Sequence, residues 1–125
     1  MLVYPAIEVA YQNGWEMEAE FHLPSDRVLS GMIGAHGRED LVVVPAKGMP
    51  RDLGPDLMER LIESHCDHGL PPGTWLSIAE VEDVNNAYFK FTQGTVPAHW
   101  LALYGAMKGF QIGGKEPRLV FWFSE

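Results

Sequence analysis

Trp15-Glu16-Met17-Glu18-Ala19-Glu20-Phe21-His22-Leu23 decides the fold, because apolar and polar residues alternate through this stretch without a break. Successive side chains of a β-strand point to opposite faces of a sheet, so the alternation predicts a strand with one apolar face. Residues 3–11 are also strand-like, and Gln12-Asn13-Gly14 between the two segments is typical of a hairpin turn. We therefore predict a β-hairpin over residues 3–23.

The register of this hairpin is expected to keep the apolar residues on one face. A three-residue loop with Gly14 in a left-handed conformation achieves this. It pairs Tyr11 with Trp15, Val9 with Met17, Ile7 with Ala19 and Pro5 with Phe21. The same register pairs Glu8 with Glu18. Paired residues share a face of the sheet, so both carboxylates are expected on the face opposite the apolar residues.

Four carboxylates, those of Glu8, Glu16, Glu18 and Glu20, are thus expected as a row on the other face of the hairpin. Neighbours along one strand would lie ~7 Å apart, which is similar to the phosphate spacing of a DNA strand. A row of like charges opposes folding, so it either faces water or meets a cationic partner. Both interpretations stay open: the glutamates keep an edge hairpin from aggregating, or they bind a partner.

The charge balance restricts the classes of partner. The 125 residues include 17 acidic and 9 basic ones, and the formal net charge is −8. This excess of carboxylates argues against direct binding to nucleic acid or to an anionic membrane, since both select clustered Lys and Arg. The single cysteine, Cys66, fits a reducing compartment. With no signal-peptide pattern and no long apolar run, we expect one cytoplasmic domain over residues 1–125.

The rest of the sequence predicts three helices and four more strands. The helices are expected from Ser25 to Gly34 or Gly37, from Pro55 to Gly69 and from 95 to 107, and the strands over 41–44, 75–81, 87–92 and 117–123. The predicted order is ββαβαββαβ, which indicates an α+β domain whose mixed sheet is packed by two or three helices. The last strand is apolar on both faces, so we expect it in the centre of the sheet or at a dimer seam.

Motifs for cofactors and catalysis are incomplete. Gly109 to Glu116 follows the phosphate-loop pattern, but Glu116 stands where that motif needs Ser or Thr. His65-Cys66-Asp67-His68 supplies only half of a zinc ligand set. A pair of facing carboxylates, Glu8 and Glu18, could raise one carboxyl pKa, yet the pattern indicates no pocket around them. We therefore expect no metal, no cofactor and no assigned catalytic residue.

These observations favour a small acidic, non-enzymatic binding or inhibitor protein. Its acidic row would dock on a basic surface of another protein, and a nucleic-acid-binding partner would suit the phosphate-like spacing, as in nucleic-acid mimicry, immunity or anti-defence proteins. Two alternatives stay open. One is a small enzyme that combines His36, His65, His68 or His99 with a carboxylate. The other is an accessory subunit that forms a homodimer through its last strand and its aromatic residues.

Overall fold

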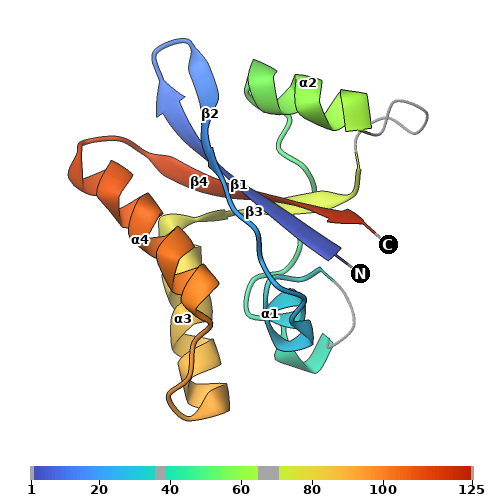
Figure 1. Cartoon of the computed structure of the whole chain (residues 1–125), viewed down its shortest axis with the longest axis vertical. Helices are drawn as coiled ribbons and strands as arrows, with labels where there is room; N and C mark the ends of the chain where they lie inside the picture. Colours follow the sequence, from blue (N-terminus) through green and yellow to red (C-terminus); the bar gives the residue numbers. More distant parts are fainter. Residues whose placement is uncertain (1, 36–38, 65–70, 125) are drawn as a thin grey trace.

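The computed structural model describes residues 2–35, 39–64 and 71–124, and it shows helices on both faces of one four-stranded sheet (Figure 1). The strands are β1 (Leu2–Tyr11), β2 (Gly14–Glu20), β3 (Gly73–Ser77) and β4 (Pro117–Ser124). The helices are α1 (Arg27–Met32), α2 (Pro55–Ser64), α3 (Ile78–Thr92) and α4 (Ala98–Ile112), with a short 3-10 helix, η1, at Glu39–Leu41. The predicted α+β class is confirmed.

The sheet has the order β2-β1-β4-β3, and every neighbouring pair of strands is antiparallel. The prediction of a mixed sheet is therefore wrong. The reason lies between β3 and β4, where α3 and α4 form a helical hairpin that returns the chain beside the strand it left (Figure 1). The terminal strand, β4, occupies a central position as expected, and its side chains from 117 to 123 are buried.

Two predicted strands are absent from the sheet, so the element order ββαβαββαβ is also wrong. Of the β-branched run 41–44, only the first residue belongs to a regular element, the end of η1. The amides of Val43 and Val44 donate to the carbonyl oxygen of Met32, at the end of α1, over 2.9 and 3.0 Å. Residues 87–92 lie in α3 instead of a strand. Tertiary packing outweighs β-propensity in both places, because residues 43 and 44 bond to the end of α1 and residues 87–92 continue the helix that begins after Ser77.

Helix α3 begins one residue after β3, because Ser77 caps it. The Ser77 hydroxyl accepts from the amide of Glu80 at 3.2 Å, and the Glu80 carboxylate accepts from the amide of Ser77 at 2.9 Å, which completes a capping box. Val81, Val84 and Tyr88 are buried at helical spacing. This period places residues 78–81, the end of the predicted strand 75–81, and residues 83–86 inside the helix.

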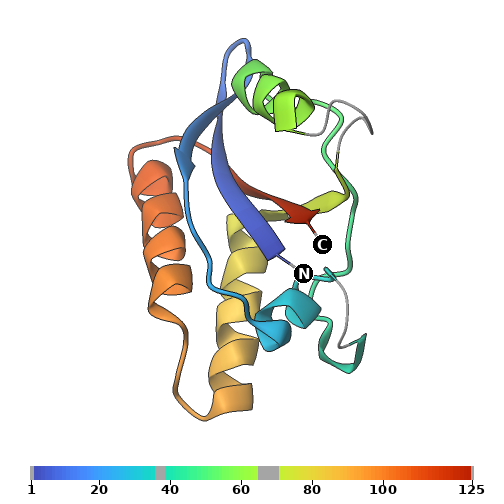
Figure 2. The same ribbon diagram turned by 45° about the vertical axis from the view of Figure 1, so that its right-hand side comes forward.

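The two faces of the sheet carry separate cores. Helices α1, α3 and α4 cover one face, which we call the α3/α4 face, over a cluster that includes Ile7, Val9, Trp100 and Phe121. Helix α2 covers the other, the α2 face, over a smaller cluster (Figure 2). That cluster is made of Ala6, Leu53, Leu57, Leu61, Val120 and Trp122. Among the described residues, no helix combines the length and apolar character that a membrane crossing requires.

The hairpin of β1 and β2 follows the predicted register only at one end. Ile7 pairs with Ala19 as expected, but Tyr11 pairs with Gly14, so the turn has two residues where three were predicted. A β-bulge after Ile7 absorbs the one-residue difference and leaves Glu18 without a partner in the ladder. Glu8 is consequently paired with Met17 and not with Glu18. Beyond a bulge, side chains two residues apart that would otherwise share a face of the sheet point to opposite faces. The alternation in the sequence does not reveal this change.

The packing of glycines gives a test of this architecture. A Cβ at Gly73 in β3 would lie 2.2 Å from the Phe121 carbonyl oxygen, whereas one at Gly105 in α4 would meet nothing within 4 Å. We expect Gly73→Ala to lower the free energy of unfolding by about 1–3 kcal/mol. Gly105→Ala should raise it by about 0.5–1 kcal/mol, because alanine favours the helix. Urea unfolding of both variants measures this, and equal effects would contradict the fold.

Candidate functional site

An ion pair is buried in the centre of the sheet. Strand register pairs Glu8 of β1 with Arg118 of β4, so both side chains point to the α2 face. Their residues are 0% and 3% exposed. Burying two charges is costly unless they are paired and hydrogen-bonded. These two side chains are therefore expected to have their polar atoms satisfied by close partners.

The partners come from the loop that precedes α2. Arg118 donates from Nε and Nη2 to Glu8 Oε1 at 3.0 and 2.7 Å, and the amide of Gly54 donates to Glu8 Oε2 at 2.7 Å. Arg118 Nη1 donates to Asp52 Oδ1 at 2.8 Å, and Nη2 also reaches the Asp52 carbonyl at 3.2 Å. We call Glu8, Arg118 and Asp52 the buried-arginine cluster. Across the described residues, no buried side-chain nitrogen or oxygen lacks a hydrogen-bond partner.

Trp15 covers this cluster from β2. Its ring lies over the Arg118 guanidinium at 4.0 Å, and its Nε1 donates to Asp52 Oδ2 at 3.0 Å. The hydrogen bond from Arg118 is the largest influence on Asp52, and it holds the pKa of that carboxyl below its usual value of 3.8 despite the opposing effect of burial. Asp52 is therefore ionised at neutral pH, and its side chain is 66% exposed.

A groove of about 320 Å³ opens beside the buried-arginine cluster. Residues from four separate parts of the chain line it, among them Trp15, Arg51, Asp52, Trp75, Glu116 and Arg118. Trp75 belongs to β3, and the Lys47 ammonium lies 3.5 Å from the centre of its ring. Lys47 also forms an ion pair with Glu80. Both half-buried tryptophan rings that line the groove are thus in contact with a cation of this chain. The volume lies at the lower end of the range for ligand pockets, about 300–1,000 Å³.

The structure disperses the predicted acidic row. The expectation that Glu8 faces outward with the other three is wrong, because Glu8 is fully buried against Arg118. Glu20 pairs with Ala6 on the α2 face and forms an ion pair with Arg60 of α2 at 2.8 Å. Glu16 pairs with Val9 and so lies on the opposite face.

All three predicted carboxylates of β2, those of Glu16, Glu18 and Glu20, are exposed on what is an edge strand of the sheet. Glu18, at the bulge, accepts a hydrogen bond from the hydroxyl of Tyr11, and this bond raises the pKa of that phenol. Lys115 lies over the Tyr11 ring at 4.8 Å. Within the described part of the chain, no cation forms an ion pair with either Glu16 or Glu18. The register therefore brings together only part of the predicted partner-binding surface.

The predicted histidine and cysteine groups are mostly outside the described residues. His36, His65, Cys66, Asp67 and His68 fall there, and His99 is exposed near the start of α4. Among residues 2–35, 39–64 and 71–124, no group of three or more His, Cys, Asp or Glu is placed to hold a metal ion.

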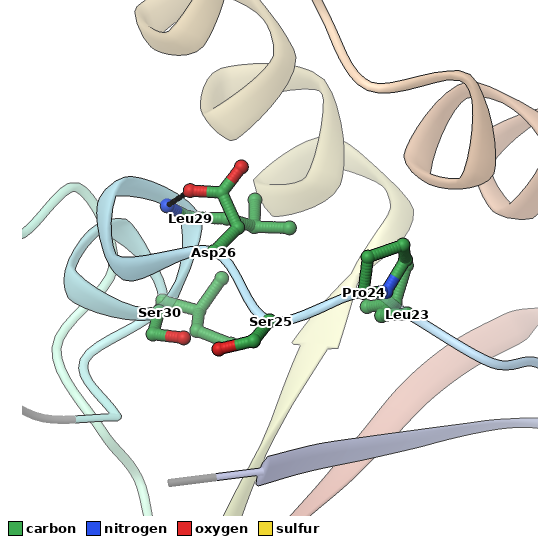
Figure 3. Close-up of a pocket in the computed structure, with 7 residues that line it drawn as sticks. Leu23, Pro24, Ser25, Asp26, Leu29 and Ser30 are labelled. Atoms are coloured by element: carbon green, nitrogen blue, oxygen red, sulfur yellow. Dashed lines mark hydrogen bonds between the residues drawn. The ribbon is translucent and has the colours of Figure 1, made fainter.

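A second hollow lies where the chain enters α1, and it has room for about 10 Å³ (Figure 3). Asp26 in its wall caps α1 by accepting from the amide of Leu29 at 3.0 Å. The other carboxylate oxygen accepts from the hydroxyl of Tyr88 at 2.6 Å, and burial together with this bond raises the pKa of Tyr88 to about 12. Asp26 thus joins α1 to α3, and the hollow is too small for a ligand.

Sequence reasoning missed the buried-arginine cluster. The available signal was one acidic and one basic residue, Glu8 and Arg118, each in a strand that is otherwise largely apolar. Opposite charges isolated in two buried strands indicate that the strands are neighbours. Comparison with protein-family models, curated proteins and solved structures gives no match to this chain. Its function is therefore inferred from the site alone.

The buried ion pair predicts strongly non-additive effects. Glu8→Met leaves the Arg118 guanidinium buried with only Asp52 as an acidic partner, and Arg118→Met leaves the Glu8 carboxylate buried without a cation. We expect each single variant to lose about 3–5 kcal/mol of unfolding free energy. The double variant should lose less than either, since it buries no charge. Urea unfolding of the four proteins measures the cycle, and additive losses would contradict the assigned pair.

Asp52 predicts a pH dependence of stability. Its pKa in the folded protein is lowered, so the ionised carboxylate contributes stability above the unfolded value of 3.8, and this contribution is lost as the pH falls through the lower folded value. We expect Asp52→Asn to be less stable than the wild type near neutral pH. The difference should shrink in acid. Unfolding midpoints measured across the pH range check this, and a constant difference would count against it.

Proposed function

We propose that this protein is a non-enzymatic binding protein that recognises a basic surface of a partner protein through exposed carboxylates of β2. One observation supports this most. Among the described residues, Glu16 and Glu18 are exposed on an edge strand and form no ion pair, whereas Glu8 and Glu20 are neutralised by Arg118 and Arg60. Exposed carboxylates without an internal cation are available to an external one.

The overall charge favours the same kind of partner. A formal charge of −8 on 125 residues gives a negative field that attracts a basic protein over several ångströms before contact. Such attraction weakens with salt, because the Debye length shrinks to about 8 Å at physiological ionic strength. Nucleic-acid mimicry is not part of the proposal, since it depended on a single row of four carboxylates on one face.

The two alternatives have less support. A histidine enzyme requires a histidine beside a carboxylate in a pocket, and neither of the two hollows described above is lined by one of the described histidines. A homodimer through the last strand requires a free edge on β4, but β4 is hydrogen-bonded to β1 on one side and to β3 on the other. Neither geometry gives a reason to prefer those functions.

Substitution of the exposed β2 carboxylates tests the proposal. Immobilised wild-type protein should retain a basic protein from a cell extract at low salt and release it at high salt. Glu16→Gln combined with Glu18→Gln should remove most of that retention, because glutamine keeps the size of the side chain and loses its charge. The Kd of the purified partner for both proteins, measured at two salt concentrations, quantifies the effect.

A matched control changes the same number of charges elsewhere. Glu39→Gln combined with Asp83→Asn removes two exposed carboxylates from η1 and α3, and this variant should keep a Kd within about twofold of the wild type. The stability of the β2 double variant should equal or exceed that of the wild type. The proposal fails if the two double variants weaken binding equally, or if the partner stays bound in high salt.

A further inference from the structure

We infer that the groove between Trp15 and Trp75 binds an arginine side chain of the basic partner. This inference rests on the proposed function, because it concerns how that partner is recognised. The groove lies on the α2 face at the end of the sheet where the β1–β2 hairpin turns. Trp15 and Glu16 are neighbours on the edge strand β2 and point to opposite faces of the sheet, so a partner contacts both the groove and the exposed carboxylates only around that edge.

Charge in the groove favours a cationic occupant. The two arginines and two carboxylates that line the groove balance each other. With Glu8 beneath Arg118 and the Lys47–Glu80 pair beside Trp75, three cations and four carboxylates leave a net charge of −1. The Arg118 guanidinium is 4% exposed and is already engaged by Glu8 and Asp52, so it offers little attraction for an anion. Glu116 is exposed and forms no side-chain ion pair with any described residue.

The aromatic walls favour a planar cation. Tryptophan is the best aromatic partner for a cation, and Arg118 over Trp15 and Lys47 over Trp75 show that both rings already pack against cations in this chain. A guanidinium can also stack on an aromatic ring while donating forked hydrogen bonds to a carboxylate. Asp52 and Glu116 are the acceptors within the groove, and Asp52 is ionised at neutral pH. A compact lysine ammonium would use only part of this arrangement.

The groove is held in shape without a ligand. Trp15 donates a hydrogen bond to Asp52, and Arg118 donates hydrogen bonds to both Asp52 and Glu8. These bonds connect three groove residues to the centre of the sheet. A preformed site loses little conformational entropy when it is filled. This rigidity favours binding of a single side chain.

The direct test uses N-acetyl-arginine amide as the probe, with N-acetyl-citrulline amide as an uncharged probe of nearly equal shape. The chain has four tryptophans, so indole 15N labelling gives four resonances that single Trp→Phe variants assign. We expect the arginine probe to shift the Trp15 and Trp75 resonances and leave that of buried Trp100 unchanged. The citrulline probe should produce no comparable shift.

Two groove variants should move the affinity in opposite directions. Glu116→Gln removes an accepting carboxylate and should weaken binding of the arginine probe about two- to fivefold. Arg51→Gln removes a competing cation and should strengthen it by a similar factor. Asp83→Asn on α3, outside the groove, serves as the control and should leave the affinity unchanged.

The outcomes separate the groove from the proposed function. Equal shifts with arginine and citrulline, equal binding of N-acetyl-lysine amide, or no shift at Trp15 and Trp75 would each overturn the inference. None of these results depends on a partner protein or on Glu16 and Glu18. If the β2 double variant loses its partner while the arginine probe fails, only the groove assignment is wrong. If the probe binds but β2 has no influence on the partner, only the proposed function is wrong.

Discussion

The Glu8–Arg118 ion pair is the interaction on which the rest of the site depends. It joins the two central strands on the α2 face, and it draws the loop before α2 onto the sheet through Gly54 and Asp52. A buried pair of this kind is weak support for net stability, because desolvation offsets much of the attraction. Its structural effect is to fix positions: a shift of either strand by one residue would leave a charge unpaired in the interior.

Strand β1, which carries Glu8, lies between the two cores of the molecule. Ile7 and Val9 flank Glu8 along β1 and face α3 and α4, while Glu8 itself faces α2. The groove therefore sits on a support that is packed from behind by the larger core and fixed at the front by the pre-α2 loop. This arrangement explains how the partly exposed Trp15 keeps a defined position at the surface, while Trp75 packs against the smaller core.

Much of the fold was predictable from local periodicity, but the site was not. The alternation in β2, the start of α2 at Pro55 and the apolar run of β4 each indicate one element, because they satisfy both local propensity and burial, while the predicted end of α2 at Gly69 lies outside the described residues. The predictions at 41–44 and 87–92 were wrong because β-propensity is outweighed there by bonding to α1 and by continuation of helix α3. Glu8 was misplaced because the face it occupies is covered by the loop before α2 and by Arg118, and Asp52 was missed because its role depends on Arg118, distant in sequence.

The groove draws its walls from β2, from the loop before α2, from β3 and from the start of β4, which are dispersed over most of the sequence. No short peptide cut from the chain can reproduce it. An occupant that binds only this assembled surface would favour the folded over the unfolded chain by mass action. Binding in the groove therefore requires the folded chain, and the fraction of molecules that bind an occupant measures the fraction with an intact sheet.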